Sequence, residues 1–142
     1  MAYSHSSDDP YSLSGNTIYA IFVDSHGDLW IGTDLYGINR RTVKTTNFLH
    51  YFSNPNDPYS ISHNTINSIC EDINGNIWVA TDGGGLNRFD RRTNKFFHYK
   101  HDPDDQSTIY SDRISQVFSD SKGNLWISFQ NGGFDKLPVS ST

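Results

Sequence analysis

Hydrophobic residues along this chain of 142 residues occur in short runs that polar segments rich in Gly, Asn and Asp separate. The run Ile77–Thr81 (IWVAT) is nearly all apolar, and the preceding Asn64–Asp72 (NTINSICED) carries β-branched residues at alternate positions. Both patterns predict β-strands, and no segment has the periodicity of an amphipathic helix. Two more strands are expected over Leu86–Asp90 and Lys95–Lys100, with turns at NGN, DGGG and RRTN between the four.

The same pattern stands three times in the chain, and each copy begins 48 residues after the previous one (Asp24, Asp72 and Asp120). No insertion interrupts the offset, so equivalent residues can be paired across all three copies. Besides the aspartates, three kinds of residue recur in register. They are Gly27, Gly75 and Gly123; Trp30, Trp78 and Trp126; and Gly37, Gly85 and Gly133.

A strict repeat of this length with four short strands in each copy indicates a β-propeller. We therefore expect an all-β array over residues 1–142, made of three four-stranded antiparallel meanders, each forming one blade. Blade 1 is expected over about residues 11–57, blade 2 over about 58–105 and blade 3 over about 106–142. The outer strand of blade 3 is expected to be missing, or to be supplied by residues 1–9 of a partner chain.

The repeated residues resemble a known family. The pattern Asp-x-x-Gly-Asn/Asp-Leu/Ile-Trp-Ile/Val, followed by Thr-Asp-x-x-Gly-Leu/Ile-Asn-Arg, is similar to the two-component regulator propeller repeat. The resemblance covers about Ser12 to Lys136, although the third copy departs from it at SFQNGG. It implies the sensor region of a hybrid two-component system of the Bacteroides type, with a periplasmic location and carbohydrate fragments as ligands.

Composition and charge exclude several other classes. The net charge is −5, and no cluster of Lys and Arg is present to neutralise phosphates, so nucleic-acid binding is not expected. No apolar run is long enough to insert into a membrane, and the first residues lack the charged and apolar regions of a signal peptide. The single cysteine, Cys70, stands where the other copies have Phe22 and Phe118, which predicts a small core residue.

The repeated residues are interpreted as structural. One Trp in each blade, flanked by aliphatic residues, is expected to pack between neighbouring blades. The repeated Asp resembles a calcium ligand, but the two positions after it vary freely, and a cation, Lys122, occupies one of them. An Asx-type turn is preferred, with the carboxylate accepting N–H bonds from the loop. We expect no metal, no cofactor and no catalytic residues.

Candidate ligand-binding residues come from the variable positions. In a four-stranded meander, the second turn and the connection between blades lie at the same end. Tyr rings and polar side chains gathered there suit a saccharide, because rings stack on sugars and polar groups bind hydroxyls. The candidates are Asp34, Tyr36, Asp82, Tyr110, Arg113 and Asn131.

Three blades cannot close a ring, and an open array leaves two apolar faces in water. Self-association is therefore expected. A homodimer with six blades is favoured over a trimer with nine, and an oligosaccharide is a possible further partner.

The leading hypothesis is a non-catalytic sensor or ligand-binding module. The alternatives are a self-assembling scaffold without a ligand and a propeller lyase. A lyase needs a His/Glu metal cluster at the ring mouth, where this chain offers only His63.

Overall fold

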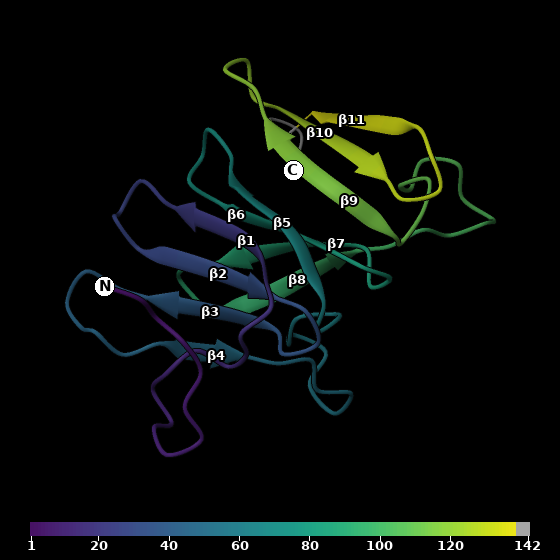
Figure 1. Cartoon of the computed structure of the whole chain (residues 1–142). Coiled ribbons are helices and arrows are strands. Elements are labelled where there is room, and N and C mark those ends of the chain that lie inside the picture. The colour runs from purple at the N-terminus through teal and green to yellow at the C-terminus, as the bar shows by residue number, and fades with distance from the viewer. Residues whose placement is uncertain (139–142) are drawn as a thin grey trace.

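The computed structural model describes residues 1–138, which form three antiparallel sheets fanned side by side (Figure 1). Blade 1 contains β1 (Ile18–Val23), β2 (Leu29–Thr33), β3 (Ile38–Arg41) and β4 (Leu49–Tyr51). Blade 2 contains β5 (Ile66–Glu71), β6 (Ile77–Thr81), β7 (Leu86–Asp90) and β8 (Lys95–Tyr99). Blade 3 contains β9 (Ile114–Ser119), β10 (Asn124–Phe129) and β11 (Phe134–Pro138).

The all-β propeller-type fold predicted from the repeat is confirmed. Strands within each blade pair in chain order, so every blade is a simple meander. Blade 3 has three strands within residues 1–138, and its outer edge is β11, where the repeat predicts the missing strand. The end of the expected third blade, residues 139–142, lies outside the described residues.

The repeated Asp builds the turn between the first two strands of each blade. In blade 1, one oxygen of Asp24 accepts the backbone N–H groups of His26 (2.8 Å) and Asp28 (3.0 Å). The other oxygen accepts the indole N–H of Trp30 at 2.7 Å. Asp72 and Asp120 make the same bonds to their own turns and tryptophans. The interpretation of this motif as an Asx-type turn is confirmed.

The glycine inside this turn is required by the backbone. Gly27, Gly75 and Gly123 have φ angles of +84°, +84° and +85°, which L side chains rarely adopt. The turn therefore keeps one geometry in all three blades, and it holds the Trp of each blade in one orientation.

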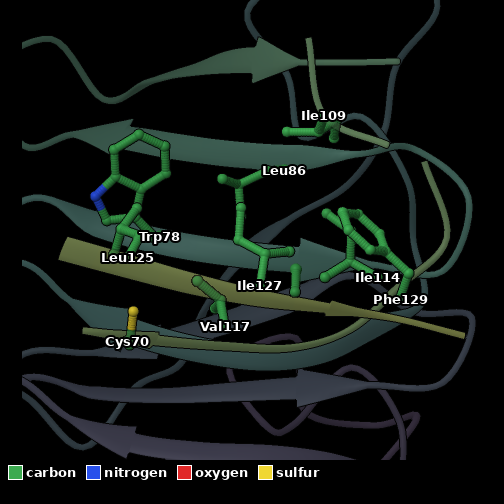
Figure 2. Packing of buried hydrophobic residues seen from close by; sticks show 10 residues of the cluster. Cys70, Trp78, Leu86, Ile109, Ile114, Val117, Leu125, Ile127 and Phe129 are labelled. Atoms are coloured by element: carbon green, nitrogen blue, oxygen red, sulfur yellow. The ribbon is translucent and has the colours of Figure 1, made fainter. Parts of the chain in front are cut away.

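Two apolar clusters join the blades, and each takes one side from a preceding blade and one from the next. We call the side that faces the following blade the forward face and the opposite side the rear face. Trp30 and Trp78 are fully buried on the forward faces of blades 1 and 2, as predicted for an interblade wedge. Figure 2 shows the second cluster, in which Trp78 and Leu86 pack against Leu125, Ile127 and other rear-face residues of blade 3.

Close backbone approach marks the first of these interfaces. A Cβ atom added to Gly32 of β2 would lie 2.5 Å from the Ile66 side chain of the next blade. Ala80 and Ser128 occupy the same position in blades 2 and 3. Blade 1 thus depends on a missing side chain to bring β2 against β5.

The outer strands are fastened by histidine. The Nε2 atom of His50 lies 2.6 Å from the carbonyl oxygen of Ser12, and His98 repeats this contact with Ser60 at 2.6 Å. Both histidines therefore hold the outer strand to the connection that enters their own blade. No helix long and apolar enough to cross a membrane occurs within residues 1–138.

Candidate functional site

The first strands of the three blades, β1, β5 and β9, lie next to one another at the inner side of the fan (Figure 1). Their second residues are Tyr19, Asn67 and Ser115, which occupy equivalent positions of the repeat. These three side chains and Gln130 line one open hollow. The hollow is therefore the stretch of the inner surface that all three blades share.

Gln130 belongs to the turn after the second strand of blade 3, and the equivalent turns of the other two blades lie at the same end of the sheets. Asp34, Asp82 and Gln130 are equivalent residues there, and each donates its backbone N–H across to the start of a first strand. These bonds end on the carbonyl oxygens of Thr17, Thr65 and Arg113, respectively, at 3.0 Å each. The expectation that this turn and the blade connection lie at the same end is thus met.

Between blades 1 and 2, the Thr65 hydroxyl donates a hydrogen bond to Asp34 (3.2 Å). Tyr19 lies close enough for the same carboxylate to act on its phenol. A hydrogen bond to Asp34 and the negative charge of Asp34 raise the pKa of Tyr19, and burial and Asp82 add smaller contributions. The Tyr19 hydroxyl is therefore a neutral donor at ordinary pH, and its side chain remains exposed.

Between blades 2 and 3, Arg113 joins two equivalent turn residues. Its Nε lies 3.4 Å from a carboxylate oxygen of Asp82, and its Nη2 donates to the amide oxygen of Gln130 at 2.9 Å. A single bridge of backbone pairing also links Asp82 and Arg113. We call Tyr19, Asp34, Asn67, Asp82, Arg113 and Gln130 the inner cluster.

Three of the predicted site residues, Asp34, Asp82 and Arg113, belong to the inner cluster. The other three lie apart from it. Tyr36 is exposed on the turn before β3, where its ring covers Gly15. Tyr110 packs on Phe129 (ring centroids 5.6 Å apart) and lines a separate hollow beside His101. Asn131 stands exposed in the turn between β10 and β11.

Tyr19, Asn67 and Gln130 were not among the predicted site residues. A signal for the first two existed in the sequence, because Tyr19, Asn67 and Ser115 differ between copies while their neighbours Ile18, Ile66 and Ile114 are all Ile. A variable position inside an otherwise regular strand marks a side chain that does not pack between blades. Gln130 differs from the Asp of the other two copies in the same way.

The inner cluster is polar and rich in hydrogen-bonding groups. Carboxylates, amides, a phenol and an ion-paired guanidinium offer donors and acceptors, and within residues 1–138 no group of three potential metal ligands gathers.

Burial, with smaller contributions from the negative charges of Asp72 and Glu71, raises the pKa of the Cys70 thiol to about 12. Cys70 is therefore an inert core residue and not a nucleophile.

Three carboxylates surround Arg91 at the end of the blades opposite the inner cluster. Its Nη2 lies 2.7 Å from an oxygen of Asp24 and 3.4 Å from one of Glu71, and its Nη1 lies 3.8 Å from Asp28. Asp28 in turn binds Arg40 at 2.7 Å. These charges neutralise one another across the interface between blades 1 and 2, which identifies the cluster as a structural clamp.

The model of the two component regulator propeller family matches residues 12–35 and 60–83, which fall in the first two copies of the repeat. No curated protein sequence matches the chain. Among solved structures, the extracellular domain of a hybrid two-component system of B. thetaiotaomicron is similar at 27% identity and a TM-score of 0.81. The match covers 91% of this chain and 18% of that domain.

A second extracellular domain of a hybrid two-component system from B. thetaiotaomicron is 32% identical, with a TM-score of 0.71. This match covers 88% of the chain and 17% of that domain. Virginiamycin B lyase of Staphylococcus aureus shares the fold at 14% identity and a TM-score of 0.55, over 87% of this chain and 41% of the lyase. The chain thus spans less than a fifth of the two sensor-system domains, and the first two copies of its repeat match the model of the two component regulator propeller family.

Proposed function

We propose that this chain is part of an extracytoplasmic sensor propeller and that its inner cluster binds a neutral saccharide without catalysing a reaction. The location and the sensor role are carried over from the similar extracellular domains of two-component systems. The saccharide is argued from the inner cluster itself.

The observation that carries the proposal is the mixture of groups around one open hollow. Tyr19 offers a half-exposed aromatic face, on which the apolar side of a sugar ring can stack. Asn67 and Gln130 line the same hollow and offer amide groups to hydroxyls. Vicinal hydroxyls suit carboxylate and amide oxygens, because each such oxygen accepts more than one hydrogen bond.

Charge favours a neutral ligand over an acidic one. Asp34 and Asp82 contribute two negative charges at the hollow, and Arg113, the positive charge among them, is already paired with Asp82. An anionic ligand would meet the unpaired Asp34 and a chain of net charge −5. The hydroxyl-rich surface of a neutral oligosaccharide meets no such repulsion.

The cluster also suggests how binding would be transmitted. Two polar contacts of the cluster join successive blades, Asp34 with Thr65 and Asp82 with Arg113. A ligand that replaces or tightens these contacts would change the free energy of one blade arrangement relative to another, which is the requirement for a signal.

Saturation-transfer NMR with a panel of neutral and uronic-acid oligosaccharides tests the proposal. We expect transfer to a neutral member of the panel, lost in Tyr19→Ala and at least about tenfold weaker in Asn67→Ala, since one good polar or stacking contact is worth that much. Tyr11→Ala is the matched control, because Tyr11 is equally exposed (53% against 52%) and lies in the connection that leads into blade 1. Binding that survives Tyr19→Ala, or no binding by any member, would refute the assignment and leave a scaffold.

A further inference from the structure

The two interblade interfaces are built from equivalent residues. On the forward side stand a Trp, a Tyr from the outer strand and an aliphatic residue of the third strand, here Trp30, Tyr51 and Ile38. On the rear side stand aliphatic residues of the first two strands and, between blades 1 and 2, Phe96 of the outer strand. The second interface repeats this arrangement with Trp78, Tyr99 and Leu86 against blade 3.

The forward face of blade 3 carries apolar residues at the equivalent positions, but no part of residues 1–138 packs over this face. Phe118 and Phe134 are 62% and 71% exposed, whereas the equivalent Cys70 and Leu86 are 8% and 0% exposed. Trp126 is only partly buried, in contrast to the fully buried tryptophans of blades 1 and 2. Large exposed apolar side chains on one face indicate an interaction surface.

The rear face of blade 1 is the other half of the same kind of interface. Ile21 is 68% exposed, whereas the equivalent Ile69 and Val117 are 8% and 5% exposed. Leu13, Ile31 and Phe48 form a small cluster there that contains rear-face residues only. This cluster lacks the Trp and Tyr that complete the other two.

The first residues of the chain already lie where an outer strand of a preceding blade would end. Tyr3 meets Phe48 edge to face at 5.9 Å and 81°, as Tyr51 of blade 1 meets Phe96 of blade 2 at 5.5 Å and 74°. Next along the chain, the backbone N–H of His5 donates to Asn16 at 2.7 Å.

The residues equivalent to His5 repeat its bond one and two blades later. Ser53 donates to Asn64, and His101 donates to Asp112, again at 2.7 Å in both cases. Residues 3–5 therefore follow the path that leaves β4 and β8.

We infer that a second copy of this chain docks its rear face and its first residues onto the forward face of blade 3. Met1–Tyr3 of one copy then occupies the position of β4 and completes blade 3 of the other. The register follows from Tyr51 opposite Ile38 and Tyr99 opposite Leu86, which places Tyr3 opposite Phe134 of the partner copy.

In that position the Tyr3 ring lies on Trp126 of the other copy. Tyr51 stacks on Trp30 in this way (6.2 Å), and Tyr99 packs on Trp78 (5.2 Å). Within one chain, a rear face of this kind already packs on a forward face of this kind twice. A second copy of the chain is therefore the occupant that fits the open forward face of blade 3.

For the chain of residues 1–142 taken by itself, the geometry of this contact fixes the expected stoichiometry. The two faces are different surfaces, so the contact is head-to-tail and closes only as a ring. Two copies give six blades and three copies give nine, and propellers typically have four to eight blades. We therefore expect a dimer, in which both copies contribute first strands to one central surface.

Light scattering over a dilution series of the 142-residue chain is the first test. We expect a mass of twice 16.1 kDa that falls to one chain only at high dilution. Phe118→Asp should raise the dissociation constant at least about tenfold, because the contact of a buried Phe is worth that much and a buried charge adds a penalty. Tyr110→Asp is the control, since Tyr110 is nearly as exposed (59%) but lies on the connection between blades 2 and 3, where it packs on Phe129 of its own chain.

Cross-linking tests the register independently of the mass. Mixed Tyr3→Cys and Phe134→Cys chains should form a disulfide-linked pair under mild oxidation, and Tyr11→Cys mixed with Phe134→Cys should not. Cys70 is buried and does not interfere. A monomer at all concentrations would overturn the inference, and so would a dimer that resists Phe118→Asp or fails to cross-link through residues 3 and 134.

Discussion

The interface between blades 1 and 2 and the interface between blades 2 and 3 have the same plan but different contents. The first is aromatic and ionic: Phe89 packs edge to face on Trp30, and Arg91 binds Asp24 across the blades. The second is mostly aliphatic, and beside the exposed ion pair of Arg113 with Asp82 it has neutral polar contacts. Asn67 donates to the carbonyl oxygen of Ile114 (2.9 Å), and the hydroxyl of Ser68 bonds to the backbone of Val117.

The difference separates what a repeat must keep from what it can change. Trp, Tyr and the Asp–Gly turn recur at both interfaces, because they set the shape of a blade and the distance to the next. The residues that vary decide how strongly two given blades bind and which blade follows which. Arg91 shows this most clearly, because its equivalent in blade 1 is the apolar Val43.

The largest expected effect separates the two interfaces by their aromatic content. Phe89→Ala should lower the free energy of unfolding by about 3–5 kcal/mol, because it removes a fully buried ring and leaves a cavity beside Trp30. Leu137→Ala, at the equivalent position of the second interface, should cost clearly less, because Leu137 is only partly buried. Urea unfolding followed by circular dichroism measures both, and equal losses would contradict the comparison.

The ionic clamp should have the next largest effect. Asp24→Asn should lower the free energy of unfolding by about 1–3 kcal/mol more than Asp72→Asn, because Asp24, unlike Asp72, forms an ion pair with Arg91. The two variants disturb equivalent turns and equivalent Trp contacts, but Asp72 also accepts a hydrogen bond from the Asn76 side chain (3.0 Å), so the difference is a lower limit on the effect of the clamp. A difference near zero would mean that Arg91 is held by Glu71 and Asp28 alone.

Acid should weaken the interface between blades 1 and 2 by protonating Asp24. Burial alone would raise the pKa of Asp24, but hydrogen bonds from Trp30 and Arg91 outweigh burial and lower it. A carboxyl with a lowered pKa in the folded state contributes stability that is complete above its unfolded pKa of about 3.9 and is lost as the pH falls further. The urea concentration at the midpoint of unfolding should therefore decrease as the pH falls below about 4, and Asp24→Asn should make this decrease smaller. An unchanged slope would contradict the assignment.

Cys70 allows the second interface to be followed separately. Its pKa of about 12 and its burial beside Val117 should make the folded protein react with a thiol reagent roughly a thousandfold more slowly than a free thiol at pH 8. Ser68→Ala should speed the reaction, because it removes the contact that closes β5 over β9. Arg91→Ala, at the other interface, should leave the rate nearly unchanged, and equal acceleration by both would show that the blades open together.

The smallest effect on stability is expected in the inner cluster. Arg113→Ala should change the free energy of unfolding by no more than about 1 kcal/mol, because the guanidinium is exposed and such ion pairs contribute little. The fold and the inner cluster can therefore be altered separately. A large loss of stability on Arg113→Ala would show that blades 2 and 3 depend on this bridge.

The sequence predicted the frame well because the frame repeats. The first three strands of a blade occur three times in the chain and the fourth strand twice, and β6 and β7 begin and end as expected at Ile77–Thr81 and Leu86–Asp90. The Asx-type turn was predicted from the same register, whereas the bond from the Trp indole to the Asp carboxylate was not. Repetition gives no such help with the inner cluster, because positions such as that of Tyr19 and Asn67 carry a different residue in each copy.

Position in the meander correctly placed Asp34, Asp82 and Arg113 at one end of the blades, while their role as ligand-binding residues stays a prediction. Tyr36 and Tyr110 were predicted at the same end because they vary between copies, and in the structure their rings lie on Gly15 and Phe129, apart from the inner cluster. Tyr19 was missed because its strand looks like any other until the strand is known to line the inner surface.

Gly32 has a consequence for the curvature of the whole array. The small rotation from one repeat to the next sets the bend of a repeat protein, and at the first step that rotation depends on Ile66 lying against a backbone without a Cβ. A methyl group at this one position would widen the wedge between two blades and so change the angle through which the chain turns. The packing around the α-carbon of Gly32 therefore contributes to the number of blades that complete a circle.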